Sequence, residues 1–149
     1  MKVVITIDDD SPEVVALQTR FHLAGIVRQN RWLMHRNPRI PPLYQSGVKF
    51  RLEPWATQVQ HFANCLEVLD RGWGDCKMLS AYRLAELAEN AATPEIGARY
   101  GLKIYWRIHD RDPLHDGLGA NGRGEMRIFH VQVRHPNGAI EDPSRMLHS

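Results

Sequence analysis

Three residues that together can perform thiol chemistry occur at well-separated points of the chain. Cys76 follows Gly-Trp-Gly-Asp, His130 lies in the middle of "FHVQV", and Asp142 lies in "IEDPS". A thiolate is a strong nucleophile, and an imidazole can take the thiol proton while a carboxylate holds the ring in position. If the fold brings the three side chains together, this set predicts nucleophilic attack on a carbonyl group.

The surroundings of Cys76 predict that it opens a central helix. Asp75 is a suitable N-cap for a helix over residues 76–90, and apolar residues cover most of the girth of that helix. Unpaired N–H groups and the helix dipole favour negative charge at a helix N-terminus, so we expect the pKa of the thiol to be lowered.

The other cysteine, Cys65, is expected to pack in the core. Cys65 and Cys76 lie eleven positions apart and form no C-x-x-C pair, which argues against a zinc ribbon or a redox motif. We expect two free thiols, with Cα atoms more than about 7 Å apart.

The C-terminal half has the period of antiparallel strands. Apolar residues alternate over 102–108 and 128–133, Pro136-Asn137-Gly138 is a hairpin signal, and a returning strand is expected over 139–142. Neighbouring strands would bring His130 and Asp142 within hydrogen-bonding reach. We expect Cys76 Sγ to lie within about 4 Å of a His130 ring nitrogen.

The N-terminal half is mostly helical. We expect a strand over 2–7, a helix from Ser11-Pro12 to about Arg36, a strand near 48–52 and a helix over 57–69. The apolar positions of the first helix that roughly follow helical spacing are Val14, Leu17, Phe21, Ala24, Val27 and Met34. Helices followed by antiparallel strands predict the α+β class, with a buried helix packed on a small antiparallel sheet.

Composition sets limits on the class of protein. The chain has 149 residues, 43% of them apolar, which predicts one domain over 1–149. No apolar run approaches the roughly 20 residues that span a bilayer, and the apolar start is too short for a signal peptide. Between Glu13 and Glu53 there is no acidic residue but seven basic ones. A solvated basic face is favoured there over a site for nucleic acid or an acidic partner, because the basic residues are spread out and no nucleic-acid-binding motif accompanies them.

Three segments together resemble a known family. "WGDCKMLSAYRLAELA", "FHVQV" and "IEDPSRM" resemble blocks of the transglutaminase-like cysteine protease superfamily, which has a papain-like core. The upstream "YQSGVKFRLEPW" is similar to the small transglutaminase-like proteins of tailed phages and prophages. The likeness covers residues 44–146, with 1–43 as an N-terminal strand and basic helical extension. It implies that Cys76 is the nucleophile, His130 the general base and Asp142 the residue that orients His130.

The resemblance leaves the substrate and the oxyanion donor open. Lys77 and Gln132 stand where the family often has an acidic residue and an aromatic residue. Candidates for a second oxyanion donor, beside the backbone N–H of the cysteine, are Trp73, Gln58 and Gln60. The His and Asp residues over 109–116 favour a polar loop over a metal site, so no metal or cofactor is expected.

Two functions of different classes follow. The first is thiol-dependent acyl chemistry on an amide, as a cysteine protease or amidase or a transglutaminase, encoded by a phage or prophage. The second is a non-catalytic phage structural or assembly protein that keeps the fold and docks through its basic N-terminal third. The expected partners are a protein or peptide substrate and other phage structural proteins; nucleic acid is less favoured, and no membrane is expected. The expected location is the cytoplasm of the bacterial host or the virion.

Overall fold

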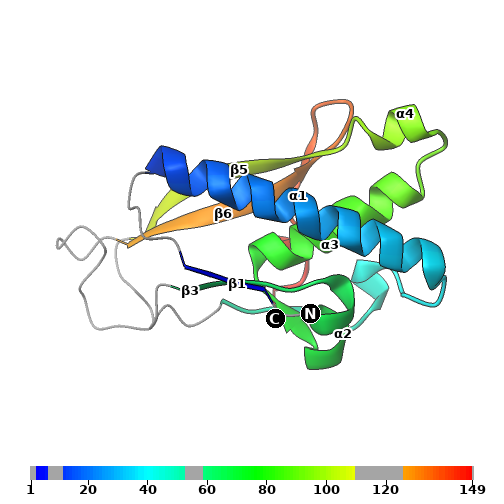
Figure 1. Cartoon of the computed structure of the whole chain (residues 1–149), viewed down its shortest axis with the longest axis horizontal. Helices are drawn as coiled ribbons and strands as arrows, with labels where there is room; N and C mark the ends of the chain where they lie inside the picture. Colours follow the sequence, from blue (N-terminus) through cyan, green and yellow to red (C-terminus); the bar gives the residue numbers. More distant parts are fainter. Residues whose placement is uncertain (1–2, 7–11, 53–58, 110–125, 149) are drawn as a thin grey trace.

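The computed structural model of the chain describes residues 3–6, 12–52, 59–109 and 126–148 (Figure 1). The helices are α1 (Pro12–Arg36), α2 (Cys65–Arg71), α3 (Cys76–Glu89), α4 (Pro94–Gly97), α5 (Pro143–Met146) and the 3-10 turn η1 (Leu43–Gln45). The strands are β1 (Val3–Thr6), β2 (Lys49–Phe50), β3 (Val59–Phe62), β4 (Trp73–Gly74), β5 (Gly101–His109), β6 (Met126–Arg134) and β7 (Ile140–Glu141). No helix in these described stretches is long and apolar enough to cross a membrane.

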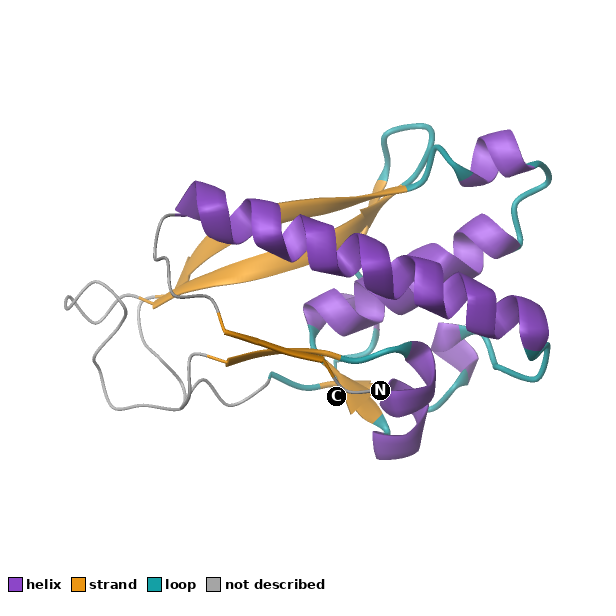
Figure 2. Cartoon of the chain, in the orientation of Figure 1, coloured by secondary structure: helices purple, strands orange, loops and turns teal. Residues whose placement is uncertain are grey.

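The strands form three small sheets. Strand β1 pairs antiparallel with β3, β2 pairs parallel with β4, and β5, β6 and β7 form an antiparallel sheet in that order. The predicted turn after β6 is present, with Gly138 at φ +86°. The long α1 runs alongside α3, with β5 and β6 behind them (Figure 2). Mixed helices and antiparallel strands are thus confirmed.

Helix α3 is the centre of the molecule, as its apolar girth predicts. On one side Met78, Leu79 and Tyr82 pack in a cluster with Val68 and Leu43. On another side the buried cluster consists of Leu23, Ile26, Phe62, Cys76, Ala81 and Val131. Since α3 contributes to both clusters, it is buried on opposite faces and has little freedom to shift.

The helix predicted over 57–69 is wrong. Val59–Phe62 is strand β3, which pairs in register with β1, and α2 begins only at Cys65. Asn64 has an extended backbone and caps α2 in a capping box with Glu67. Pairing with a strand more than fifty residues away overrides the local helical period, and Cys65 opens a helix instead of lying within one.

Helix α1 has the predicted limits at the proline start and the arginine end, but two of the apolar residues that follow the helical spacing are exposed. Leu17 and Phe21 are 69% and 78% exposed. The buried positions are Thr19, Leu23, Ile26 and Asn30. The face is decided by contact with α3 and by the side chain of Asn30, whose Oδ1 accepts the Cys65 N–H at 2.7 Å. An apolar and basic face of α1 is therefore left on the surface.

Two glycine substitutions should have opposite effects on stability. A Cβ added at Gly25, an exposed position of α1, meets nothing within 4 Å, so Gly25→Ala should stabilise the fold by about 0.5–1 kcal/mol. A Cβ at Gly97 would lie 2.8 Å from the Ala88 carbonyl oxygen, so Gly97→Ala should destabilise by about 1–3 kcal/mol. Urea unfolding of both variants measures this. Equal changes of the same sign would contradict the packing of α4 against α3.

Candidate active site

The first turn of α3 places three ionisable side chains in succession. Asp75 is the N-cap, as predicted, and its Oδ1 accepts the Met78 N–H at 3.1 Å. Its other oxygen pairs with the Lys77 ammonium, and each of these side chains is only 8% exposed. Cys76 lies between them and is itself 8% exposed. The thiol is thus flanked by a buried ion pair.

The thiol meets strand β6 at its edge. The backbone of Val131 hydrogen-bonds the Cys76 thiol. One turn further along α3, the Ser80 hydroxyl donates to the Val131 carbonyl oxygen at 2.8 Å. Strand β7 pairs with Val133 and Arg134, so at Val131 the helix takes the place that a longer β7 would fill.

His130 and Asp142 make the contact that the strand pattern predicts. His130 Nε2 lies 2.6 Å from Asp142 Oδ2, and both side chains are nearly buried. Gln132 Nε2 donates to the same carboxylate oxygen at 3.0 Å, and the Ser144 hydroxyl donates to the other at 2.5 Å. The Tyr105 ring packs edge-on against the imidazole, with centroids 5.4 Å apart. The imidazole is therefore held from two sides.

His130 meets Asp142 at the edge of β6 that faces β7, and the Cys76 thiol contacts β6 at Val131 on that edge. His130 and Val131 are neighbours on β6 and point to opposite faces. The His130 ring nevertheless leans toward the β7 side, because its Nε2 binds Asp142, the residue that follows β7. Cys76 meets β6 on that same side, close enough for the charge of Asp142 to raise the pKa of its thiol.

The expected acidification of Cys76 is wrong for this arrangement. Burial, and after it the neighbouring Asp75 carboxylate, raise the pKa of the Cys76 thiol to about 12. The Lys77 ammonium and the backbone hydrogen bond from Val131 act in the opposite direction but are the weaker effects. Burial also raises the pKa of Cys65, to about 11. Both cysteines are free thiols, as predicted, and both are neutral in this structure at pH 7.

The remaining predicted site residues are distributed as follows. The Trp73 ring on β4 contacts the guanidinium groups of Arg71 and Arg51, at 4.0 and 5.3 Å from the ring centroid. Gln60 belongs to β3, where its backbone pairs with β1, while its side chain and Gln58 lie outside the described residues. The role of these three residues as oxyanion donors stays a prediction.

A metal site is not found in the described part of the chain, where no group of His, Cys, Asp and Glu side chains could hold an ion. The loop segment 110–116, which contains most of the acidic residues weighed for such a site, lies outside the described residues.

One partly buried network was missed from the sequence. Glu141 accepts hydrogen bonds from Arg83 Nε at 2.7 Å and from the Tyr44 hydroxyl, and it lies 2.6 Å from His135 Nε2. Arg83 lies on α3, so this network ties β7 to the helix that begins at Cys76. Strand alternation was the signal available in the sequence. Successive residues of a strand point to opposite faces, so Glu141 and its neighbour Asp142 are expected to bind different partners.

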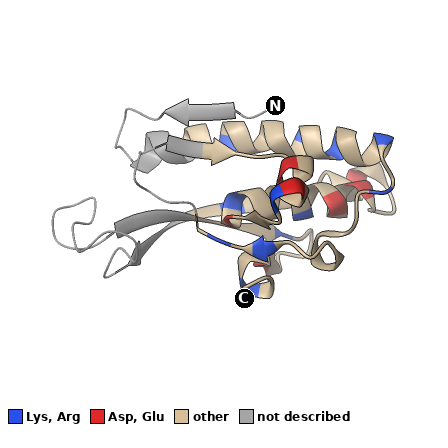
Figure 3. Ribbon diagram, turned by 90° about the horizontal axis from the view of Figure 1, so that it is seen from below, with Lys and Arg blue, Asp and Glu red and all other residues tan. Residues whose placement is uncertain are grey.

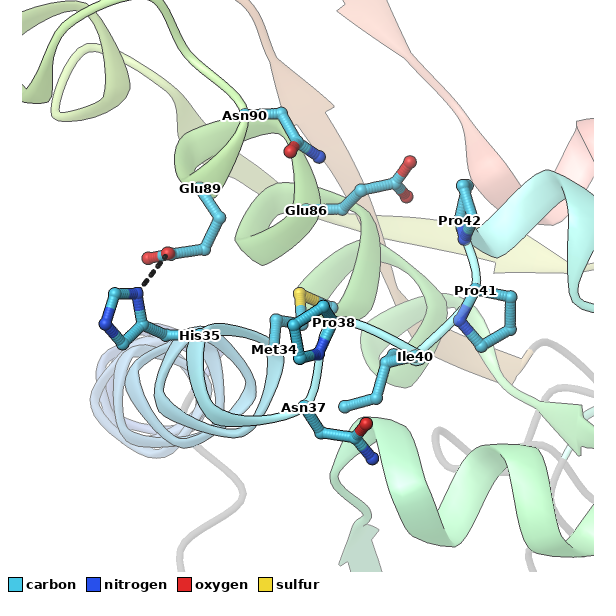
Figure 4. A pocket seen from close by; sticks show the side chains of 10 residues that line it. All are labelled: Met34, His35, Asn37, Pro38, Ile40, Pro41, Pro42, Glu86, Glu89 and Asn90. Carbon is cyan, nitrogen blue, oxygen red and sulfur yellow. Dashed lines mark ion pairs between the residues drawn. The ribbon is translucent and has the colours of Figure 1, made fainter.

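A pocket of about 310 Å³ opens where α1 ends, lined by prolines and by Glu86 and Glu89 (Figure 4). Both of its carboxylates already bind other groups of the protein. Glu86 accepts the Leu43 N–H at 3.1 Å, and Glu89 pairs with Arg31 at 2.8 Å. The pocket is therefore a poor site for a cation.

Comparisons of the chain with models of known protein families, with curated proteins and with solved structures found no match.

Replacing Asp142 by Asn should reveal a charge-dependent contribution to stability. Despite partial burial, hydrogen bonds from Ser144, Gln132 and His130 lower the pKa of Asp142 from 3.8 to about 2. A lowered carboxyl pKa stabilises the fold above about pH 4, and this stabilisation is lost as the pH falls toward 2. Asp142→Asn should lose about 2 kcal/mol at pH 7 and little at pH 2.

Urea unfolding at several pH values measures this difference. Asn can still cap α5, so the N-terminal hydrogen bonds of that helix are retained. Asp70→Asn, at an exposed position of α2, is the matched control and should show no such pH dependence. An equal loss for Asp142→Asn at both pH values would mean that packing, and not charge, is responsible.

Proposed function

We propose that this protein performs thiol-dependent acyl chemistry on an amide, with Cys76 as nucleophile, His130 as general base and Asp142 as the residue that orients His130. The observation that carries the proposal is the 2.6 Å contact between His130 Nε2 and Asp142, at the same sheet edge where the Cys76 thiol bonds Val131. A nucleophile at a buried helix start, with a base on a strand and its orienting group just after the adjoining strand, is similar to the arrangement of a papain-like core.

The contact with Asp142 selects the imidazole atom that would act as base. A carboxylate at Nε2 favours the tautomer that carries its proton there, so Nδ1 is the nitrogen that accepts the Cys76 proton. The thiolate then attacks the amide carbonyl, and the tetrahedral intermediate expels the amine, which takes the proton back from His130. Water attacking the resulting thioester gives hydrolysis, and an amine gives transglutamination.

The neutral thiol sets a condition on this mechanism. With a pKa near 12, Cys76 cannot rest as a thiolate, so deprotonation must be coupled to the imidazole. The proposal requires Sγ to come within about 4 Å of Nδ1 when substrate binds. Lys77 favours the resulting thiolate, because its ammonium lowers the pKa of the thiol.

A second candidate is a non-catalytic structural or assembly protein, of the kind found in phage particles. The burial of Cys76 supports it, because a buried neutral thiol packed against Leu23 and Val131 behaves as a small core residue. The exposed basic face of α1 would then be the docking surface. In that case His130 and Asp142 would serve stability alone.

Turnover by substituted proteins separates the two functions. Cys76→Ala should abolish hydrolysis of casein or incorporation of a dansyl amine, and Cys76→Ser should be nearly as inactive. Asp142→Asn should retain some activity but lose several powers of ten in kcat. Cys65→Ala is the control and should stay active at temperatures where it is folded. Parental activity in Cys76→Ala would refute the thiol mechanism.

Alkylation of the two cysteines gives a test that needs no substrate. If His130 is the base, iodoacetamide should modify Cys76 faster than Cys65 between pH 6 and 9, as followed by peptide mass spectrometry. The substitution His130→Ala should abolish that difference. If the protein is a scaffold, both thiols should react slowly, with rates that rise together toward the raised pKa values near 11 and 12.

A further inference from the structure

A groove between α1 and the edge strand β5 is not used by the proposed chemistry. It has a volume of about 340 Å³. Its apolar lining comes from Ala24 and Val27 on α1, from Leu84 on α3 and from Leu102 and Ile104 on β5. A groove between a helix and a strand edge has the shape that an extended chain segment fills.

The outer edge of β5 is open for pairing. In the described part of the chain, β5 pairs with β6 and no strand lies on its other side. Residues of an antiparallel pair either exchange both hydrogen bonds or exchange none. Val131 directs its backbone hydrogen bonds to α3, so its partner Ile104 points its N–H and C=O away from β6. These groups face the side on which an added strand would lie.

The rim of the groove is basic. Arg20 and Arg28 are exposed and make no ion pair with any described residue, whereas Arg31 is already paired with Glu89. Lys103 is exposed on β5, and none of the described residues that line the groove is acidic. Figure 3 shows arginines along α1, whose residues 17–36 include no Asp or Glu.

We propose that this groove binds an extended segment of a partner protein that carries both apolar and acidic residues on one face. The segment adds to the free edge of β5 through main-chain hydrogen bonds. Its apolar side chains enter the groove over Leu84, and carboxylates on the same face of the segment pair with Arg20 and Arg28, which line the same groove. The apolar floor and the open strand edge favour a peptide over a nucleic acid, which would meet the arginines alone. This inference does not rest on the thiol chemistry.

Fluorescence anisotropy with the full chain tests it. The probe is a short fluorescein-labelled peptide of the pattern Glu-Thr-Val-Thr-Val-Thr-Glu, in which glutamate and valine share one face of the strand and threonine occupies the other. A peptide of the same sequence with N-methylated valines cannot pair with β5, and one with lysine in place of glutamate repels the rim. Both should bind at least tenfold more weakly than the probe. Amide chemical shifts of Leu102 and Ile104 should move on binding of the probe.

Two variants locate the site. Arg20→Glu/Arg28→Glu should weaken binding at least tenfold, and Ala24→Trp should do the same by filling the groove. The double variant Arg39→Glu/Arg99→Glu changes charge equally at exposed positions outside the groove and should bind like the parent.

Several results would overturn the proposal. The first is that the probe does not bind at millimolar concentration. The second is that the N-methylated peptide binds as tightly as the probe. The third is that Arg39→Glu/Arg99→Glu weakens binding as much as Arg20→Glu/Arg28→Glu does. A labelled DNA or RNA oligonucleotide that binds more tightly than the probe, and is lost in Arg20→Glu/Arg28→Glu, would assign the surface to nucleic acid instead. A dimer in solution that Ala24→Trp converts to monomer would assign it to a second copy of the chain.

Discussion

The arrangement of the candidate site depends on how the first turn of α3 meets the edge of β6. Strand β7 is too short to reach Val131, and a buried backbone without a partner would be costly. Cys76 and Ser80, one turn apart on the same helix face, supply the missing hydrogen bonds. This contact sets the position of α3 against the sheet, and it brings a thiol to the edge where His130 meets Asp142.

The same contact explains why the thiol is neutral. Seating α3 on β6 removes Cys76 from water, and the desolvation outweighs the favourable effects of Lys77 and of the hydrogen bond from Val131. The contact that brings the Cys76 thiol to this sheet edge therefore also raises the pKa of the thiol. A catalytic role requires a base that takes the proton directly from the thiol, and a structural role requires nothing more than the packing already present.

Two adjacent carboxylates at the end of β7 stabilise this edge of the sheet through different partners. Glu141 faces α3 and binds Arg83, Tyr44 and His135, while Asp142 faces the other way and binds His130. The first tie links the strand to the helix that carries Cys76, and the second orients the imidazole. A shift of β7 would disturb both, so the dyad and the helix are mechanically coupled.

The sequence by itself determined the elements whose signals are local. Asp75 predicts the start of α3, the turn at Gly138 and strand alternation predict the contact between His130 and Asp142, and both held. Tertiary structure alone decided that Val59–Phe62 pairs with β1, which face of α1 is buried, and that the Cys76 thiol is neutral. The first two depend on contacts with residues distant in the chain, and the third depends on the removal of water from the thiol. Local sequence periodicity carries information on neither cause.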